Sequence, residues 1–322
     1  MPIKLVMLPP HTPTTREWVK RLVALPEISL VVAENADQAT KEIVDADAAY
    51  GTLTPELLQS ARRLRWLQSP QIAPPAGYYF PELVTHPVTV TNFRGIFNDR
   101  IGVHIMAFVL AFARGLHRYY PQQLRREWRQ ATPRNAGVVH LPDATAVIVG
   151  VGEIGAETAR LAATFGMHVI GVDARRKDKP TGVAELHSPS MLDDILPRGD
   201  FVILTVPLTP DTAGYMNRKR FQKMKPSAFF INIGRGKTTR LDDLVAALEA
   251  GELAGAGLDV FEQEPLPADH PLWTMPGVLI TPHTAGYGPG LDERRYEIIS
   301  DNYRRLLAGE TMRNVVDKAN WF

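Results

Sequence analysis

The sequence predicts an α/β fold built from parallel β-sheets with helices on both faces. Short apolar or β-branched runs alternate with amphipathic helical stretches along most of the chain, which is the order that parallel strands and crossover helices require. One apolar run, at 145–149, is followed directly by glycines at G-x-G-x-x-G spacing, the pattern of a strand, a tight turn and a helix. We therefore expect two Rossmann-like, doubly wound domains.

The first series of strands and helices occupies residues 1–98. Strands are expected at Lys4–Leu8, Ser29–Val32, Ala48–Gly51, Leu64–Gln68 and Val88–Thr91, and helices at Thr15–Leu25, Gln38–Asp45 and Pro55–Ala61. No glycine fingerprint follows any of these strands. The first domain is therefore expected to have a Rossmann-like sheet without a phosphate-binding turn.

The stretch Ala146–Asp173 reads as one complete βαβ unit. Its first strand leads into the three glycines of the fingerprint. Gly150 would permit the tight turn, Gly152 would let a pyrophosphate approach the backbone, and Gly155 would let the helix pack against the strand. The helix, Glu153–Phe165, would direct its free N–H groups and positive dipole end toward that pyrophosphate. This combination predicts a bound dinucleotide.

The second strand of this unit, His168–Val172, ends at an acidic residue. Asp173 is placed to bind the adenosine ribose hydroxyls and to repel a 2′-phosphate, which favours NAD. Arg175, Arg176 and Lys177 follow at once, and arginines at such a place can receive the phosphate of NADP. We expect NAD as the cofactor and leave NADP as the alternative.

The other elements complete a second doubly wound sheet. Further strands are expected near 201–205, 228–232, 255–259 and 278–281, helices at Asn98–Leu116, Tyr119–Arg129 and Gly290–Leu307, and a connector at Pro133–Pro142. The last helix would return to the first domain. The expected division is therefore a substrate domain formed by 1–98 plus 290–322, with a dinucleotide-binding domain at 99–289 inserted into it.

Composition narrows the classes of function. The net charge is +1, so nothing suggests a nucleic-acid partner or a charged membrane surface. The chain has no cysteine, which excludes disulfides, thiolate metal sites and a cysteine nucleophile. Its histidines form no H-x-x-x-H or H-E-x-x-H pair, so we expect no metal. No G-x-S-x-G nucleophile elbow occurs either. Without a signal-like or membrane-spanning run, a cytoplasmic location is expected.

Chemically useful residues follow four of the expected strands. Ligands of open parallel sheets bind beyond the carboxyl ends of the strands. Val206–Thr212 follows one strand, Arg235 lies between two glycines after the next, Asp259–Glu264 follows a third, and His283 follows the last. A guanidinium, carboxylates and an imidazole would thus meet on the nucleotide's side of the sheet.

With these residues in place, the chain resembles the D-isomer-specific 2-hydroxyacid dehydrogenase family over essentially its whole length. The matching blocks, in order, are NFRGI at 92–96, the GVGEIG fingerprint, VPLTPDT at 206–212, INIGRG at 231–236, LDVFEQEPLP at 258–267 and TPH at 281–283. The resemblance implies an NAD-dependent oxidoreductase and, in most members, a homodimer.

The resemblance also implies the roles of individual residues. His283 would be the acid–base, Glu264 would hydrogen-bond to it, fix its tautomer and favour its protonated form, and Arg235 would bind the substrate carboxylate and keto oxygen. The residues expected at the cofactor are Gly150, Gly152, Glu153, Ile154, Gly155, Asp173, Arg175, Val206, Pro207, Thr212, Ile233, Asp259 and His283.

One segment departs from the family pattern. Many members carry a short S-x-G-x-D-like turn after the fourth strand, whereas Ser69–Phe80 here contains three prolines and a Tyr-Tyr-Phe run. We place the substrate beside Gly51, Thr52 and Gly77, together with Arg235. The expected reaction is reduction of a small 2-keto acid, glyoxylate- or hydroxypyruvate-like, to a D-2-hydroxy acid.

Two other functions stay open at this stage. Another branch of the family, such as a phosphoglycerate dehydrogenase, would share these motifs. The formate branch is disfavoured, because it has an amide where this chain has Glu264. A different class of function is an NAD(H)-sensing, corepressor-like scaffold, since some relatives of that kind keep the same Arg, Glu and His set.

Overall fold

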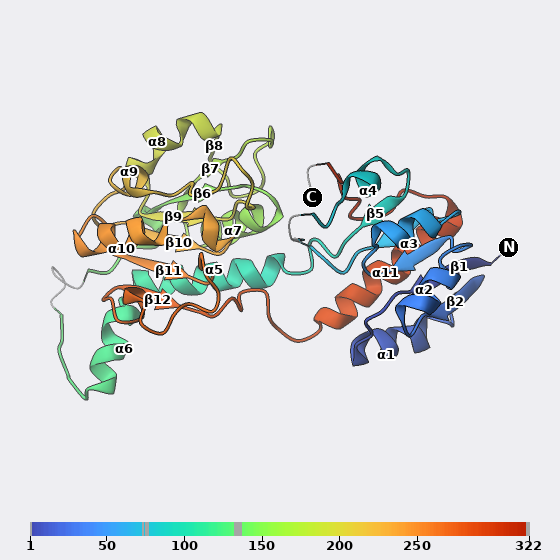
Figure 1. The fold of residues 1–322 in the computed structure, drawn as a ribbon. Coiled ribbons are helices and arrows are strands. Elements are labelled where there is room, and N and C mark those ends of the chain that lie inside the picture. The colour runs from blue at the N-terminus through green and yellow to red at the C-terminus, as the bar shows by residue number, and fades with distance from the viewer. Residues whose placement is uncertain (1, 73, 75–76, 132–136, 320–322) are drawn as a thin grey trace. The chain divides into compact units, whose positions relative to one another are not determined.

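The computed structural model describes residues 2–72, 74, 77–131 and 137–319 of the chain. This part divides into two compact units (Figure 1). One unit combines Met1–Ile96 with Pro289–Phe322, and the other is Phe97–Gly288. Each contains its own parallel sheet, so the expected fold class, α/β with two Rossmann-like sheets, is confirmed.

The first unit has a parallel sheet of five strands in the described residues, in the order β2-β1-β3-β4-β5. The strands are β1 (Ile3–Met7), β2 (Ile28–Val32), β3 (Ala48–Tyr50), β4 (Trp66–Gln68) and β5 (Thr89–Thr91), and the helices are α1 (Pro13–Leu22), α2 (Ala36–Glu42), α3 (Pro55–Ser60), α4 (Pro81–Thr85) and α11 (Leu291–Ala308). The order is that of a doubly wound, flavodoxin-like sheet.

Helix α1 shows why these segments become helices. Thr12 precedes it, and its side chain accepts a hydrogen bond from the backbone N–H of Thr15, while Pro13 occupies the first helical turn. Both features stabilise a helix start. Trp18 and Leu22 then fall on the buried face, so the helix is fixed by its cap and by its apolar stripe together.

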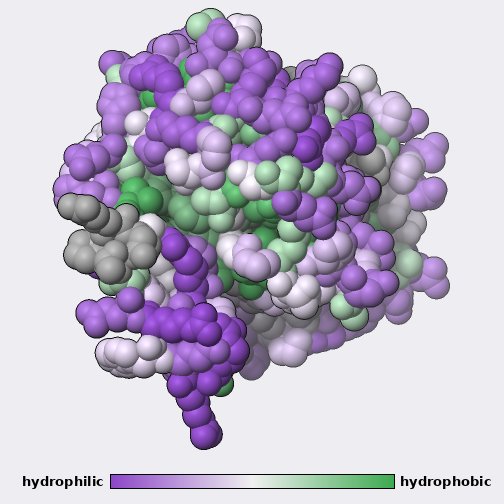
Figure 2. Space-filling view, turned by 90° about the vertical axis from the view of Figure 1, so that its left-hand side faces the viewer, coloured by the Kyte–Doolittle hydropathy of each residue, from purple (hydrophilic) through white to green (hydrophobic). Residues whose placement is uncertain are grey.

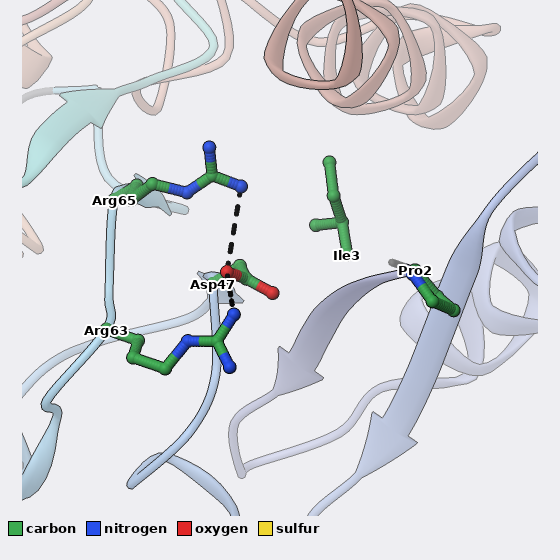
Figure 3. A pocket seen from close by; sticks show the side chains of 5 residues that line it. All are labelled: Pro2, Ile3, Asp47, Arg63 and Arg65. Atoms are coloured by element: carbon green, nitrogen blue, oxygen red, sulfur yellow. Dashed lines mark hydrogen bonds and ion pairs between the residues drawn. The ribbon is translucent and has the colours of Figure 1, made fainter.

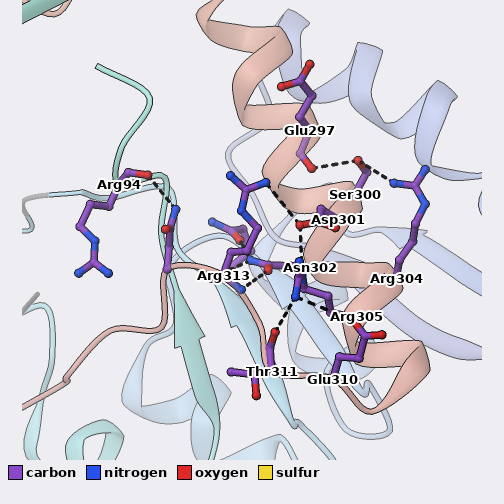
Figure 4. A network of polar contacts seen from close by, with 12 residues as sticks. Arg94, Glu297, Ser300, Asp301, Asn302, Arg304, Arg305, Glu310, Thr311 and Arg313 are labelled. Atoms are coloured by element: carbon purple, nitrogen blue, oxygen red, sulfur yellow. Dashed lines mark hydrogen bonds and ion pairs between the residues drawn. The ribbon is translucent and has the colours of Figure 1, made fainter. Parts of the chain in front are cut away.

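The segment after α11 is attached to the edge of this sheet. The backbone of Val316 donates to Val90 and that of Asn92 donates to Asn314, which covers edge strand β5. The side chain of the buried Asn302 donates to the Arg313 carbonyl at 3.2 Å and accepts from the Arg313 N–H at 2.7 Å (Figure 4). The side-chain amide of Asn302 thus makes both hydrogen bonds of the Arg313 backbone, as a residue of a neighbouring strand would.

Replacement of Asn302 by alanine is expected to lower the free energy of unfolding by about 1–3 kcal/mol, because it removes two partly buried hydrogen bonds to the Arg313 backbone and leaves a hole where the buried Asn302 side chain was. Urea unfolding of the full chain measures this. Arg304→Ala on the same helix is the control, since among the described residues that exposed side chain hydrogen-bonds only to Ser300, at 3.5 Å. Its effect should stay within about 0.5 kcal/mol. Equal effects of the two substitutions would contradict the role given to Asn302.

The second unit has a parallel sheet of seven strands in the described residues, in the order β12-β11-β10-β9-β6-β7-β8. The strands are β6 (Thr145–Val149), β7 (His168–Val172), β8 (Glu185–His187), β9 (Phe201–Leu204), β10 (Phe229–Asn232), β11 (Gly255–Leu258) and β12 (Val278–Ile280), and the helices are α5 (Asn98–Ala113), α6 (Leu116–Leu124), α7 (Glu153–Thr164), α8 (Leu192–Ile195), α9 (Arg218–Phe221) and α10 (Leu241–Glu249). The order reverses between β6 and β9, where ligands bind in such sheets.

Both faces of this sheet are buried. Ala146 and Ile148 of β6 pack in one hydrophobic cluster, which includes residues of α5 and α7, while Val147 and Val149 pack in the cluster on the other face, which includes α10. Successive side chains of a strand point to opposite faces. A strand with helices on both sides must therefore be apolar throughout, as the run TAVIV is.

Three details of this unit differ from the sequence predictions. Strand β8 was not predicted, because Glu185–His187 has no apolar run and each residue is only partly buried. The helix expected at Asn98–Leu116 ends at Ala113, because Gly115 adopts φ +72° and starts a new helix. The helix expected to reach Arg129 ends at Leu124. Residues 133–136 of the expected connector lie outside the described residues.

Helix α5 is the most apolar helix of this unit. Its buried residues include Ile105, Val109 and Phe112, which belong to the core. In the part of the chain that the structure describes, no single helix is long and apolar enough to cross a membrane; α5 and α6 meet the length and composition together but are bent by 73° at their junction.

Candidate active site

The glycine turn after β6 leaves room for a phosphate group. Gly150 adopts φ +94°, and a Cβ on Gly155 would lie 2.0 Å from the Gly150 carbonyl oxygen, so any side chain there would force the helix away from the strand. At Gly152 a Cβ would meet nothing within 4 Å. No side chain caps the first turn of α7, and uncapped N–H groups bind anions. The turn therefore fits a pyrophosphate.

Asp173 follows β7 and shapes the loop beside the glycine turn. Its carboxylate accepts hydrogen bonds from the backbone N–H groups of Val151 at 2.7 Å and of Arg175 and Arg176 at 2.8 Å each. Burial acts to raise the pKa of Asp173, but these hydrogen bonds outweigh burial and lower it. The carboxylate is therefore held in its charged form.

The loop after β9 packs directly on the glycine turn. A Cβ on Gly150 would lie 2.9 Å from the Val206 side chain. Farther along, the Thr212 hydroxyl donates to the Pro207 carbonyl at 2.6 Å and accepts from the Thr209 N–H at 2.7 Å. Thr212 thus fixes the bend of a loop that lies at the reversal point of the sheet.

The loop after β10 is shaped by Asn232, a residue that sequence reasoning did not single out. Its buried side chain accepts from the Gly234 N–H at 3.0 Å and donates to the Arg235 carbonyl at 3.3 Å and the Thr239 hydroxyl at 3.0 Å. An Asx-type turn of this kind imitates a backbone turn. Its signal in the sequence is an asparagine that ends an apolar strand two positions before a glycine.

Arg235 lies in this loop next to the loop after β11. A Cβ on Gly236 would be 1.8 Å from the Phe261 carbonyl oxygen, so only glycine allows the two backbones to approach. Arg235 is mostly buried and donates to the Gly234 carbonyl at 2.7 Å. Burial lowers its pKa, and the nearby charge of Glu264 opposes that shift. Within the described residues no carboxylate lies within 4 Å of this guanidinium.

His283 and Glu264 form a hydrogen-bonded pair. The Nδ1 atom of His283 lies 2.7 Å from a carboxylate oxygen of Glu264, whose other oxygen accepts from the Phe261 N–H at 3.0 Å. The contact expected between the two residues is therefore present. Because Nδ1 is used, Nε2 faces outward from the pair and can exchange a proton with a ligand. His283 itself adopts φ +54°, a conformation that non-glycine residues rarely take.

Asp259, the first residue after β11, is 1% exposed and holds the turn that carries His283. One of its oxygens accepts from the Thr281 hydroxyl at 2.6 Å and from the Thr284 N–H at 2.8 Å, and the other accepts from the Ala285 N–H at 3.0 Å. Ile233 is also buried. The expected catalytic and cofactor residues thus gather at the carboxyl ends of β6, β7, β9, β10, β11 and β12.

The other expected substrate residues belong to the first unit. Gly51 follows β3 with φ +135° and its N–H donates to the Gln68 carbonyl. Thr52 is exposed, as is Gly77. The adjacent Tyr78 shares a hydrogen bond of 2.7 Å with Ser69. Residues 73, 75 and 76 of the expected substrate segment lie outside the described residues.

A cavity of about 460 Å³ in the first unit is separate from these positions. It is lined by Pro2, Ile3, Asp47, Arg63 and Arg65, with both guanidinium groups directed at the Asp47 carboxylate (Figure 3). Ile3 begins β1, and Asp47 and Arg65 directly precede β3 and β4. The cavity therefore lies at the amino ends of the strands, opposite the edge where ligands bind.

Comparison with known proteins agrees with this geometry. Residues 106–285 match the family model described as "D-isomer specific 2-hydroxyacid dehydrogenase, NAD binding domain". A glyoxylate reductase of Thermofilum pendens is 30% identical, with 94% of each chain covered. The similarity to this reductase extends across 94% of the chain.

Two solved structures are similar over nearly the full length. A D-isomer specific 2-hydroxyacid dehydrogenase of Xanthobacter autotrophicus, in complex with NADPH and MES, is 27% identical, with a TM-score of 0.83 and 100% of each chain covered. An NADPH-dependent glyoxylate/hydroxypyruvate reductase of Sinorhizobium meliloti, in complex with NADP and sulfate, is 29% identical, with a TM-score of 0.76 and 98% and 99% covered. The chain therefore belongs to the D-isomer specific 2-hydroxyacid dehydrogenase family and contains its NAD-binding domain.

Proposed function

We propose that this enzyme reduces a small 2-keto acid, glyoxylate- or hydroxypyruvate-like, to the D-2-hydroxy acid. One observation carries the proposal: Glu264 hydrogen-bonds His283 at 2.7 Å, and this pair and the mostly buried Arg235 lie in loops that follow neighbouring strands of one sheet. A carboxylate-bound imidazole and a guanidinium are thus carried at the same edge of the sheet. The names of relatives such as the glyoxylate reductase of Thermofilum pendens support the same substrate class.

The proposed mechanism assigns one task to each of these side chains. The nicotinamide cofactor, when bound, supplies the hydride that reduces the keto carbon. Negative charge then develops on the keto oxygen, and His283 donates a proton to it from Nε2. Arg235 binds the substrate carboxylate and opposes the developing charge. Glu264 holds the His283 ring by Nδ1, so that Nε2 faces the substrate.

The proposed cofactor site consists of the glycine turn and the loops packed around it. The open space at Gly152 and the uncapped start of α7 support pyrophosphate binding there. We assign the unit Phe97–Gly288 to the dinucleotide and the other unit to the substrate. The cofactor residues proposed are Gly150, Gly152, Glu153, Ile154, Gly155, Asp173, Arg175, Val206, Pro207, Thr212, Ile233, Asp259 and His283, and Gly51, Thr52 and Gly77 are proposed for the substrate.

A panel of 2-keto acids tests this function. Oxidation of NADH or NADPH is followed by the loss of absorbance while glyoxylate, hydroxypyruvate, pyruvate and bulkier 2-keto acids are supplied in turn. We expect turnover with one or more of the small acids and a D-configured product wherever C2 is chiral. Tight cofactor binding without oxidation by any acid of the panel would overturn the proposal and favour a nucleotide-sensing scaffold.

The charged carboxylate of Asp173 supports NAD as the preferred cofactor. A 2′-phosphate brought beside it would meet a like charge, which costs several kcal/mol when it is desolvated. We therefore expect kcat/KM with NADH to exceed that with NADPH by about tenfold or more, since each 1.4 kcal/mol is worth a factor of ten. Asp173→Ser should bring the two kcat/KM values closer together, because it removes the negative charge. A wild-type enzyme that prefers NADPH would contradict this assignment.

Helix α6 supports the proposal that the enzyme is a homodimer. In the structure no residue of α6 is buried, and Leu116, Tyr120 and Leu124 follow at four-residue spacing with Trp128 (93% exposed) beyond the helix. Figure 2 views the molecule from the side on which α6 lies in Figure 1 and shows hydrophobic residues gathered across the middle of that face, with hydrophilic residues around them. On α6 itself, Leu116, Tyr120 and Leu124 form a short exposed apolar stripe. An exposed apolar stripe of this kind is typical of a protein–protein interface.

Light scattering coupled to size-exclusion chromatography tests the dimer. We expect a mass of about twice the chain mass of 35.8 kDa, and a monomer when Tyr120 and Leu124 are both replaced by glutamate, because burial of four carboxylates at a two-fold interface is unfavourable. Val23→Glu, at an exposed site of the other unit, is the control. A monomeric wild type, or a dimer that tolerates the double replacement, would contradict the proposal.

A further inference from the structure

A chain of hydrogen bonds connects helix α5 with the turn that carries His283. His104, on α5, has its Nε2 atom 2.9 Å from the Thr281 hydroxyl oxygen, and that hydroxyl donates to the Asp259 carboxylate at 2.6 Å. His104 and Thr281 are 177 positions apart in the sequence. Nothing in the proposed mechanism uses His104.

The direction of each hydrogen bond in this chain is fixed by proton count. A threonine hydroxyl has one proton, and here that proton points to Asp259. The remaining partner of the oxygen must therefore donate, so Nε2 of His104 carries a hydrogen. With its lone pair engaged by His104, the Thr281 hydroxyl is held in the rotamer that donates to Asp259.

Asp259 in turn fixes the backbone at His283 and directly after it. Its side chain accepts from the N–H groups of Thr284 and Ala285, and its carbonyl accepts from the His283 N–H at 2.9 Å. The left-handed conformation of His283, φ +54°, is one that a non-glycine residue keeps only when its surroundings enforce it. The Asp259 hydrogen bonds supply that enforcement.

The surroundings of His104 keep it in place as a neutral donor. Its ring packs edge-on against Phe108 with 5.0 Å between centroids, and its side chain is 22% exposed. Burial lowers the pKa of His104, and Asp259, 3.9 Å from Nε2, opposes the shift. A neutral ring donates to Thr281 without forming a competing ion pair with Asp259.

We propose that His104 is a positioning residue, which acts through Thr281 and Asp259 to hold the His283 turn in its working conformation. The inference rests on the proposed function for the role of His283. The positioning itself is a claim about this unit alone, and it can be measured without any turnover.

Hydrogen exchange of the segment 280–288 measures the positioning directly. Thr281→Val removes the hydroxyl at nearly constant volume, and His104→Leu removes the ring donor. In both variants we expect the amides of Thr284 and Ala285 to exchange about tenfold faster, because one partner of Asp259 is lost or misdirected and the turn opens more often. Unchanged exchange at these two amides in both variants, with global unfolding unaltered, would overturn the inference.

Kinetic measurements then distinguish a misplaced His283 from a general loss of structure. With a 2-keto acid that the wild type reduces, Thr281→Val and His104→Leu should each lower kcat about tenfold to a hundredfold, the scale of a misplaced catalytic group. Dissociation constants for NADH should change less than about threefold. Because both act through one chain, the double variant should lose no more than the worse single variant.

Conservative variants and a surface control complete the test. Thr281→Ser keeps the hydroxyl, and the amide N–H of His104→Gln can reach the same oxygen, so both should recover most of the lost turnover. His140→Leu, an exposed histidine of the same unit, should change nothing. If Thr281→Ser turns over no faster than Thr281→Val, and His104→Gln no faster than His104→Leu, positioning by a hydrogen bond is contradicted. If the wild type reduces no 2-keto acid while exchange at 284–285 responds as expected, the proposed function fails and the positioning claim stands.

Discussion

Replacement of His283 by alanine is expected to lower kcat for 2-keto acid reduction by about a hundredfold to ten-thousandfold, the usual contribution of a general acid. The imidazole that would protonate the keto oxygen is lost. The glycine turn and the loop after β9 do not depend on this side chain, so the dissociation constant for NADH should change by less than about threefold. Steady-state kinetics and NADH fluorescence measure the two quantities.

The matched control for this prediction is His168→Ala. His168 also pairs with a glutamate, Glu185, at 2.8 Å in the same unit, but it begins β7, at the amino end of the sheet. The kcat of His168→Ala should therefore stay within about twofold of the wild-type value. Glu264→Gln should give an intermediate loss, because an amide can still contact Nδ1 but carries no charge. A His283→Ala enzyme with wild-type turnover would remove His283 from its proposed role.

Replacement of Arg235 by glutamine is expected to lower kcat/KM for the 2-keto acid by about thirtyfold to several thousandfold. Loss of one partner of a buried charged hydrogen bond costs about 2–5 kcal/mol, and each 1.4 kcal/mol is tenfold. Arg235→Lys should keep part of the activity, because it restores the charge without the planar fork. Kinetics at saturating NADH measure both variants.

Lys237→Gln is the control for the charge of this loop. Lys237 is exposed and lies two residues from Arg235, so its removal changes the local charge equally without touching the buried guanidinium. Its kcat/KM should stay within about twofold, as for most surface substitutions. Equal losses in the two variants would indicate a general electrostatic effect, and no loss in Arg235→Gln would contradict substrate binding by Arg235.

Much of the fold could be predicted from local pattern. Runs such as TAVIV become central strands because both of their faces are buried, and that requirement is visible as an unbroken apolar segment. The edge strand Glu185–His187 carries no such signal, because half-buried residues can be polar. The break at Gly115 and the end of α6 at Leu124 depend on single backbone conformations, which hydrophobic periodicity does not register.

The candidate site was predictable where residues are brought together by the topology of a parallel sheet alone. Arg235, Glu264 and His283 each follow a strand of one parallel sheet, so their loops meet at one edge. Contacts between distant elements could not be predicted. Asn232 and His104 look like ordinary residues of a strand and a helix in the sequence, and their hydrogen bonds exist only after the loops and α5 have packed.

The most direct test of this account is the structure of the enzyme with NAD and oxamate, an unreactive analogue of a 2-keto acid. The account predicts the oxamate carboxylate within hydrogen-bonding distance of the Arg235 guanidinium, its carbonyl oxygen about 2.6–3.2 Å from Nε2 of His283, and the pyrophosphate on the turn at Gly150–Gly155. Oxamate bound away from Arg235 and His283, or a nicotinamide ring remote from both, would contradict it.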